Sequence, residues 1–287
     1  KNIENKKIHV DETIELELNE GNNSIKVSTK SKNGIESPTK IFNIYCNKQT
    51  IPAVYYIGIG VSSYKDSTQN LIYATKDVND IGESIKTHFQ NSKVYILSNE
   101  QVTKENIKAL KQNILSKAKT DDIIIVSFSG HGLADSELNF YYATYDIDFN
   151  QPQINGLIYE DIEWLISDIP ARKKLVLIDA CFSGEIDKDE VKSNSLPTEL
   201  DSNIKALKRG FKPKRKLIKQ NTFELMQTLF ANLSSNSGAT IISAAAGNEY
   251  AYEDEKLKNG VFTYCILQGL IEKKADNNDD SVITVSE

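Results

Sequence analysis

Cysteine, histidine and long apolar runs are all scarce in this chain of 287 residues. No apolar stretch approaches the roughly 18 residues that a membrane-spanning helix needs, so we expect no membrane partner. The chain has three cysteines and three histidines, which are Cys46, Cys181, Cys265, His9, His88 and His131. No cysteine pair has the close spacing of a zinc knuckle, and an odd number of cysteines does not suit a disulfide framework. These absences argue against structural zinc and against a disulfide scaffold.

The charge balance is acidic except in one segment. The net charge of −6 argues against a nucleic-acid partner. Between Lys205 and Lys219, however, the chain has eight basic residues and no acidic one. The members of this basic segment are Lys205, Lys208, Arg209, Lys212, Lys214, Arg215, Lys216 and Lys219. Removing their eight charges from the net −6 leaves −14 for the rest of the chain.

Methionine is also scarce: the chain has one, Met226, and begins with Lys1 rather than with a start methionine. We interpret the chain as a fragment or a processed product. We therefore expect upstream domains, a signal peptide or a regulatory partner to be missing from it.

Residues 1–48 show the period-two alternation of β-strands. The alternating apolar residues are Ile14, Leu16 and Leu18, then Ile25 and Val27, then Phe42, Ile44 and Cys46. Asn33 and Gly34 predict a turn between the later strands. An immunoglobulin-like sandwich takes about 100 residues, so we expect residues 1–48 to be the C-terminal strands of such a domain. Cys46 is expected to be a core residue of its strand.

From residue 51 onward, short runs rich in Ile and Val alternate with amphipathic segments, which predicts an α/β fold with a mostly parallel sheet flanked by helices. The expected strands are 53–59, 93–97, 122–128, 174–180 and 239–244. The expected helices lie around 78–89, 107–115, 159–169, 222–232 and 261–271, and Thr103 is expected to cap the second of them. Cys265 is expected on the core face of the last helix.

His131 and Cys181 each stand directly after one of these strands, in Ser-Gly-His-Gly and in Asp-Ala-Cys-Phe-Ser-Gly. Ligands bind at the carboxyl ends of parallel strands, so neighbouring strands would bring the two residues face to face. A histidine activates a thiol by taking its proton and later returns that proton to the leaving amine. The backbone amides of Gly132 and Cys181 are candidates to hold the developing oxyanion.

The chain from about residue 51 to residue 270 resembles the caspase-like cysteine peptidases, and among them the bacterial metacaspase-like members. The resemblance is carried by Gly58-Ile59-Gly60, by the two motifs around His131 and Cys181, and by Ile242-Ser243-Ala244-Ala245. His131 lies 50 residues before Cys181, which is the caspase spacing. The resemblance implies a caspase-type fold, a His131 and Cys181 dyad, peptide-bond cleavage and no required organic cofactor.

Asp179 lies two residues before Cys181, so a regular strand would place both on the same face about 7 Å apart. A carboxylate there suits a basic substrate residue. In the metacaspases and clostripain-like enzymes that this chain resembles, an aspartate stands at this position and cleavage follows Arg or Lys. We therefore predict that the substrate is a protein or peptide with Arg or Lys before the scissile bond. A structural role for Asp179 is the alternative, while Glu249 and Glu253 either line the same pocket or form a solvated loop.

A polar segment at about 186–221 contains the basic segment and fits neither a helix nor a strand. For an enzyme that cleaves after basic residues, it is a suitable site of self-cleavage, as in caspase-like enzymes. We predict autoprocessing at Arg209 or among Lys214, Arg215 and Lys216. A patch for nucleic acid or an acidic partner and a plain solvated linker remain alternatives.

Two weaker motifs concern cofactors. Asp276, Asn278, Asp280, Thr284 and Glu287 occupy positions 1, 3, 5, 9 and 12 of an EF-hand loop, although Ser281 replaces its glycine. This pattern suggests bound Ca²⁺, and a surface turn is the alternative. The Gly-x-Gly after residue 57 lacks the third glycine of a dinucleotide fingerprint, so we expect no nucleotide.

The sequence therefore predicts a cysteine endopeptidase. The alternative from another class is a catalytically silent caspase-like module that binds partners or transmits a signal. A serine hydrolase that uses Ser129 or Ser183 is disfavoured, because neither serine lies in Gly-x-Ser-x-Gly. The cellular compartment is left open.

Overall fold

The computed structural model describes most of the chain and divides it into two compact units, Lys1–Thr50 and Ile51–Glu287. The described residues are 12–18, 20–47, 51–135, 137, 139–183, 206–208, 231–232, 234, 237–244, 251–271, 274–279 and 283–284. Within these ranges, no helix has both the length and the apolar character needed to cross a membrane.

The first unit contains one antiparallel hairpin, formed by β1 (Gly21–Val27) and β2 (Lys40–Cys46). The predicted turn is confirmed, because Gly34 has a φ of +83° and donates its N–H to the carbonyl of Ser31 at 2.9 Å. Residues 12–18 form no strand, so the strand predicted there is wrong; alternation marks a strand only where a partner strand pairs with it. An immunoglobulin-like identity for this unit stays a prediction.

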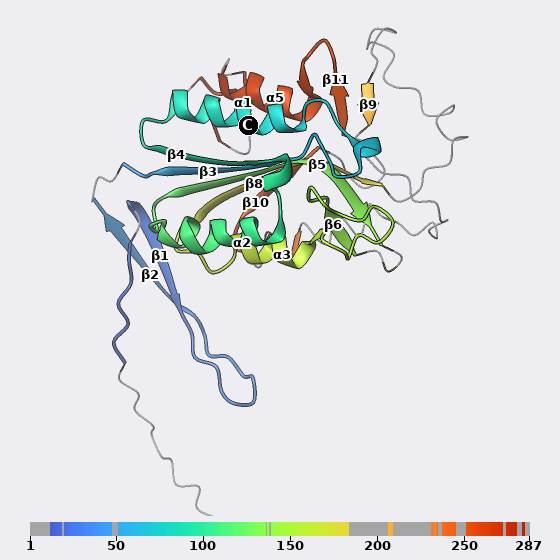
Figure 1. The fold of residues 1–287 in the computed structure, drawn as a ribbon. Coiled ribbons are helices and arrows are strands. Elements are labelled where there is room, and N and C mark those ends of the chain that lie inside the picture. Colours follow the sequence, from blue (N-terminus) through green and yellow to red (C-terminus); the bar gives the residue numbers. More distant parts are fainter. Residues whose placement is uncertain are drawn as a thin grey trace, which may run out of the picture. The chain divides into compact units, whose positions relative to one another are not determined.

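The second unit is built on a sheet whose five main strands are all parallel, in the order β10-β8-β5-β3-β4 (Figure 1). These strands are β3 (Val54–Gly60), β4 (Ser92–Ser98), β5 (Ile123–Ala134), β8 (Lys173–Ser183) and β10 (Thr240–Ser243). The predicted mostly parallel sheet is therefore confirmed. The helix expected at 222–232 lies almost entirely outside the described residues, of which 231 and 232 are helical.

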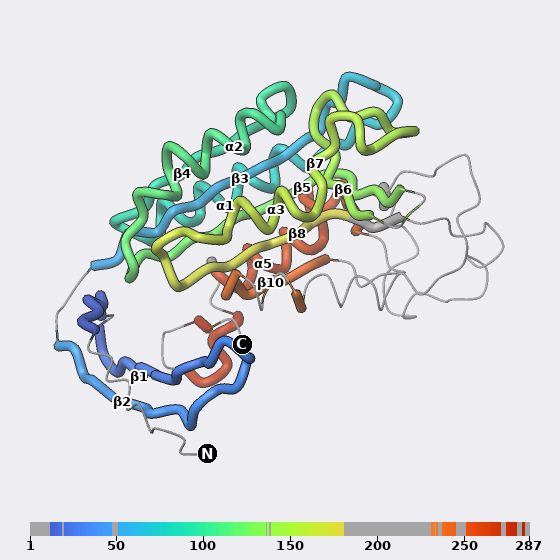
Figure 2. The backbone as a smooth tube through the Cα atoms, turned by 90° about the horizontal axis from the view of Figure 1, so that it is seen from below, coloured from blue at the N-terminus to red at the C-terminus, as the bar shows by residue number. Residues whose placement is uncertain are grey.

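Helices cover both faces of this sheet, as Figures 1 and 2 show. On one face lie α1 (Ala74–His88) and α5 (Val261–Ile271), and on the other lie α2 (Lys104–Asn113) and α3 (Tyr159–Ile166). Thr103 caps α2 as predicted, since its hydroxyl accepts the N–H of Asn106 at 3.2 Å. Short 3₁₀ turns follow β3 (Ser67–Gln69), β4 (Asn99–Gln101) and α2 (Leu115–Lys117).

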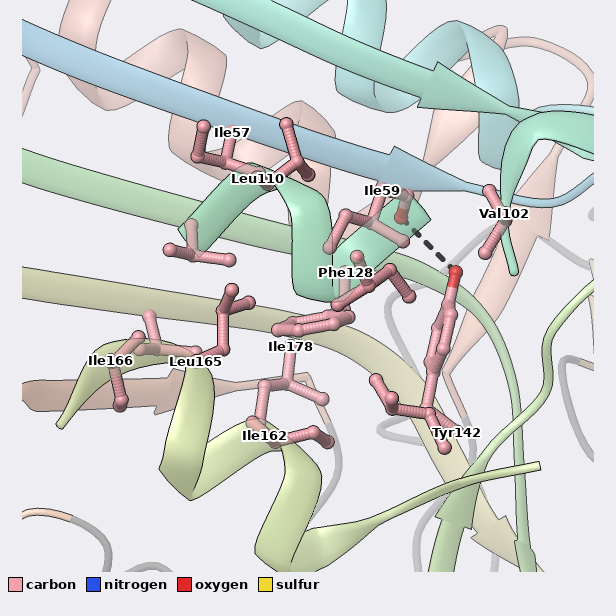
Figure 3. Close-up of a cluster of buried hydrophobic side chains, with 14 of the residues drawn as sticks. Ile57, Ile59, Val102, Leu110, Phe128, Tyr142, Ile162, Leu165, Ile166 and Ile178 are labelled. Carbon is pink, nitrogen blue, oxygen red and sulfur yellow. Dashed lines mark hydrogen bonds between the residues drawn. The ribbon is translucent and has the colours of Figure 1, made fainter. Parts of the chain in front are cut away.

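The larger apolar core lies between the central sheet and the two helices α2 and α3 (Figure 3). Ile57, Phe128 and Ile178 come from three neighbouring strands, and Leu110 and Leu165 come from the two helices. Each of these side chains is at most 9% exposed. Burying one such side chain contributes roughly 1.5–3 kcal/mol, so this core anchors the strands that lead to the site.

β5 and β8 run further than the sequence predicts, because the expected ends at 128 and 180 fall short of Ala134 and Ser183. The extension of β5 is supported by β6 (Phe140–Tyr142), which pairs with its last residues and in turn with β7 (Leu157–Ile158). His131 and Cys181 therefore lie within extended strands rather than in loops after them.

A separate three-stranded antiparallel sheet has the order β12-β11-β9. It consists of β9 (Ala206–Lys208), β11 (Tyr252–Asp254) and β12 (Asn259–Gly260). β9 lies within the basic segment, whereas β11 and β12 directly precede α5.

Candidate active site

The register of β5 and β8 brings together the two residues that the sequence singles out. The Cα atoms of His131 and Cys181 are partners across these parallel strands, and two residues earlier Ser129 is the partner of Asp179. Neighbouring strands lie about 4.8 Å apart, so the backbone places His131 beside Cys181. Only the backbone of Cys181 belongs to the described part of the structure.

His131 is held by the connection between β3 and α1, residues 61–73, here called the His131 loop. The imidazole is 4% exposed, and its Nε2 lies 2.8 Å from the carbonyl oxygen of Gln69. The backbone N–H of His131 donates to the hydroxyl of Tyr64 at 3.0 Å. Because a carbonyl oxygen can only accept, Nε2 carries a proton, and Nδ1 is the basic atom of the neutral ring.

Two aromatic rings restrict the imidazole further. The ring centroids of Tyr64 and Phe149 lie 5.2 and 5.8 Å from that of His131, and the Phe149 ring meets it edge-on. Such pairs favour defined orientations. The histidine is therefore fixed in both tautomer and orientation before any substrate binds.

Gly130 is needed for the close approach of two hydroxyl groups behind the histidine. A Cβ at this position would lie 2.9 Å from the Tyr64 hydroxyl and 3.0 Å from the Tyr142 hydroxyl. Tyr142 Oη lies 3.1 Å from the carbonyl of Ile59 (Figure 3). It also lies 2.8 Å from the carbonyl of Ser129, so its proton is shared between the two carbonyls. A side chain at Gly130 would displace these hydroxyls and the backbone that they hold.

Asp179 is 1% exposed, and one of its carboxylate oxygens accepts the hydroxyl proton of Thr263 on α5 at 2.8 Å. Its register partner Ser129 donates to a second buried carboxylate, that of Asp77 on α1, at 3.2 Å. Asp77 also accepts the side-chain amide of Asn259 at 2.9 Å and the N–H of Gly260 at 3.0 Å. Two buried carboxylates thus flank Ser129, two register pairs before the His131 and Cys181 pair.

Sequence reasoning missed Asp77 and Gln69. Asp77 is fully buried in the stripe of α1 that also buries Ala74, Val78 and Ile81. A carboxylate at an inward-facing helical position is the signal that could have found it. Gln69 acts through its backbone carbonyl, so its side-chain type carries no signal.

Glu253 does not form a solvated loop. It is 1% exposed, and its two carboxylate oxygens accept the N–H groups of Ile72 and Tyr73, each at 2.8 Å. Glu249 and the predicted cleavage residues Arg209, Lys214, Arg215 and Lys216 lie outside the described residues. The oxyanion role of Gly132, which pairs with Tyr142 across β5 and β6, stays a prediction.

The predicted calcium loop is described only in part. Asp276, Asn278 and Thr284 are described, whereas Asp280 and Glu287 are not. Among the described residues, no group of three or more His, Cys, Asp or Glu side chains could hold a metal ion. The calcium site stays a prediction.

The other cysteines and histidines lie away from the dyad along the chain. Cys265 is exposed, so its predicted core position is wrong; the buried residues of α5 include Thr263 and Leu267, and Cys265 projects from a different side of the helix. Cys46 is half-buried on β2, and Phe42 and Ile44 are exposed, so the predicted core face of that strand is not formed. His9 lies outside the described residues.

Comparisons with known proteins assign the chain to a family. The family model described as "Caspase domain" matches residues 57–286. The Metacaspase-1 proteins of Debaryomyces hansenii and Lodderomyces elongisporus are 28% and 24% identical to the chain over 145 and 146 residues. Each match covers 45% of this chain and 32% of the relative, so it spans about a third of the length of these curated relatives.

A solved structure shows the same fold. Protein GSU0716 from Geobacter sulfurreducens superposes with a TM-score of 0.53, at 17% identity, over 78% of this chain and 83% of that one. A parallel sheet with helices on both faces, carrying a histidine and a cysteine in register on two neighbouring strands, defines the class of caspase-type α/β proteins. Since the family model covers most of its length, the chain belongs to the caspase domain family, whose members are cysteine peptidases.

Proposed function

We propose that the chain is a cysteine endopeptidase that cleaves proteins after Arg or Lys, with Cys181 as nucleophile and His131 as general acid and base. The observation that carries this proposal is the register of β5 and β8, which pairs His131 with Cys181. Membership of the caspase domain family supports the same chemistry.

The fixed tautomer of His131 gives each step a named atom. Nδ1 accepts the Cys181 thiol proton, and the thiolate attacks the scissile carbonyl carbon, forming a tetrahedral oxyanion. The amides of Gly132 and Cys181 are the proposed oxyanion donors. When the C–N bond breaks, Nδ1–H protonates the leaving amine, and water then hydrolyses the acyl-enzyme. The Gln69 carbonyl supports the imidazolium of the intermediate stage by accepting Nε2–H.

The preference for a basic residue is supported by the two carboxylates around Ser129. Asp179 is placed on β8 two residues before Cys181, and Asp77 reaches the same serine from α1. A guanidinium or ammonium group bound next to Cys181 would meet two negative charges at low exposure, where charge interactions are stronger than in water. A substrate carboxylate would be repelled at this point.

The test is turnover of fluorogenic peptides that end in Arg or Lys, measured with reducing agent and with or without Ca²⁺. We expect cleavage by the wild-type chain, and loss of at least about a thousandfold in Cys181→Ala because the proposed acyl-enzyme forms on the Cys181 sulfur. Cys265→Ala is the matched control, since this exposed cysteine lies on α5 and should leave turnover unchanged.

Two outcomes would contradict the proposal in different ways. Equal turnover in wild type and Cys181→Ala would assign the cleavage to another group. No turnover under any of these conditions, together with retained binding of basic peptides, would favour the alternative of a silent caspase-like scaffold. A requirement for Ca²⁺ would support the predicted metal loop around Asp276 only if Asp276→Asn removed that requirement.

A further inference from the structure

We propose that Glu253 is a positioning residue for His131, and that it acts through the His131 loop. This inference rests on the proposed function and extends it to a residue on the small sheet β12-β11-β9. Glu253 belongs to β11, whose register partners are Leu207 on β9 and Gly260 on β12.

Glu253 fixes the end of the His131 loop where the chain enters α1. Its Oε2 accepts the N–H of Ile72 and its Oε1 accepts the N–H of Tyr73, both at 2.8 Å. Tyr73 is the N-cap of α1, and the side chain of Tyr73 makes no capping hydrogen bond there. A carboxylate at a helix N-terminus satisfies backbone donors and interacts favourably with the helix dipole. At 1% exposure these charged hydrogen bonds are protected from water.

The other end of the loop, at Ser62, is hydrogen-bonded to residues next to the start of α1. Leu71 donates its N–H to the carbonyl of Ser62 at 2.8 Å, and Thr75 donates its N–H to the Ser62 hydroxyl at 2.9 Å. Residues 62–71 therefore form a closed loop, and Glu253 binds the two amides that directly follow it.

This loop supplies two of the hydrogen-bonding groups that hold His131. They are the carbonyl of Gln69, on Nε2, and the hydroxyl of Tyr64, on the backbone N–H. Gln69 lies three residues before the first amide that Glu253 binds. Without Glu253, the two amides of residues 72 and 73 lose their acceptors, and the loop loses its attachment at the start of α1. We therefore expect the contact between the Gln69 carbonyl and the imidazole to loosen.

The chemical consequence concerns the ion pair of the dyad. A carbonyl that accepts Nε2–H stabilises the imidazolium, and the imidazolium in turn favours the Cys181 thiolate. Loosening the Gln69 contact therefore raises the pH at which Cys181 becomes a thiolate. A purely structural role for Glu253 would lower thermal stability without this change.

The experiment measures the rate of iodoacetamide alkylation at Cys181 from pH 5 to pH 9 in the full chain, read by mass spectrometry of its peptide. Alkylation of Cys46 and Cys265 in the same digests is the internal reference. For Glu253→Gln, which keeps only one acceptor oxygen, we expect the midpoint for Cys181 to rise by about one pH unit, or about tenfold slower alkylation below both midpoints. Glu255→Gln is the matched control, because Glu255 is an exposed residue of the next turn.

Glu253→Asp provides a second variant, since it keeps the charge but shortens the reach to the two amides, and we expect an intermediate shift. This variant decides the question if Glu253→Gln does not fold. An unchanged Cys181 midpoint in a folded Glu253 variant, whatever its melting temperature, would overturn the positioning role while leaving the dyad intact. If wild-type Cys181 itself titrates as an ordinary thiol near pH 8.5, the dyad fails, and this inference fails with it.

Discussion

A buried carboxylate is costly unless several donors hold it, and Asp77 is held by Ser129, Asn259 and Gly260. Asp179 is held in part by the Thr263 hydroxyl. These donors are neutral, so a substrate guanidinium with its formal charge and five N–H groups is a stronger partner for either carboxylate. At the scale of single residues, the proposed specificity is therefore a selection by charge.

Replacing Asp179 by Asn tests this selection. We expect kcat/KM for an arginine-ended peptide to fall roughly 30-fold, because a charge pair becomes a neutral contact. This fall corresponds to a loss of about 2 kcal/mol in transition-state stabilisation. A peptide that ends in glutamine should lose much less. Thr263→Val is the control, since it removes the neutral partner and keeps the charge. Equal losses for both peptides in Asp179→Asn would assign Asp179 a structural role.

Side chains with distinctive chemistry next to a strand end could be predicted, and backbone groups could not. His131, Cys181 and Asp179 stand in short glycine-containing motifs near the carboxyl ends of parallel strands, where ligands bind. The Gln69 carbonyl belongs to a residue with no special side chain. Its distance to His131 depends on the path of a loop, which no local pattern encodes.

At the scale of secondary-structure elements, the carboxylate of Asp135 closes the hairpin of β5 and β6. Asp135 follows β5 and accepts the N–H groups of Glu137 and Asn139, the side-chain amide of Asn139 and the hydroxyl of Tyr141. Burial raises the pKa of Asp135, but the hydrogen bonds from Asn139, Glu137 and Tyr141 outweigh this effect and hold it below the usual 3.8. Burial, followed by the nearby Asp135 charge, raises the pKa of Tyr141 to about 12.

The lowered pKa predicts a pH-dependent contribution to stability. Folding favours the charged form of Asp135, so its stabilisation is fully present above the ordinary pKa of 3.8 and is lost as the pH falls through the lower folded value. We expect Asp135→Asn to destabilise the chain by roughly 1–2 kcal/mol at pH 7, with the difference shrinking below about pH 4. Urea unfolding at several pH values measures this, and Glu137→Gln removes an exposed charge from the same turn as control. A difference that is constant with pH would contradict the assignment.

Elements with one clear apolar face were predicted well, and elements without one were not. The Ile and Val runs of the central strands and the Thr103 cap of α2 gave the correct type and approximate bounds. α5 is apolar around most of its circumference, so its sequence does not show which side faces the sheet, and Cys265 was assigned to the wrong side. The order of the strands in the sheet depends on long-range pairing, which local periodicity does not determine.

At the scale of the whole second unit, the central sheet contains strands from both sides of the basic segment, and the small sheet joins a strand within the segment to strands that follow it. β8 precedes this segment and β10 follows it, and they are neighbours in the central sheet. β9 lies at its beginning and pairs with β11, which comes more than forty residues later along the chain.

Cleavage at Arg209 or at Lys214 to Lys216 would divide the chain between these paired strands. We expect mass spectrometry of active enzyme to find new termini within residues 186–221, and denaturing electrophoresis to show two fragments. The native protein should elute in gel filtration at the position of the uncut chain, because both sheets hold strands from each fragment. Absence of any cut during peptide turnover would refute autoprocessing, and separation of the fragments in native buffer would refute their retention by the sheets.

Pairing of β9 with β11 has a further consequence for control of the enzyme. After a cut beyond Lys208, the three-residue strand that pairs beside Glu253 becomes the tail of the larger fragment. A short edge strand held by a few hydrogen bonds can leave its sheet and be replaced by an extended peptide of another protein. The docking edge of the processed enzyme would then be β11 itself, the strand that carries Glu253, the residue proposed to position His131.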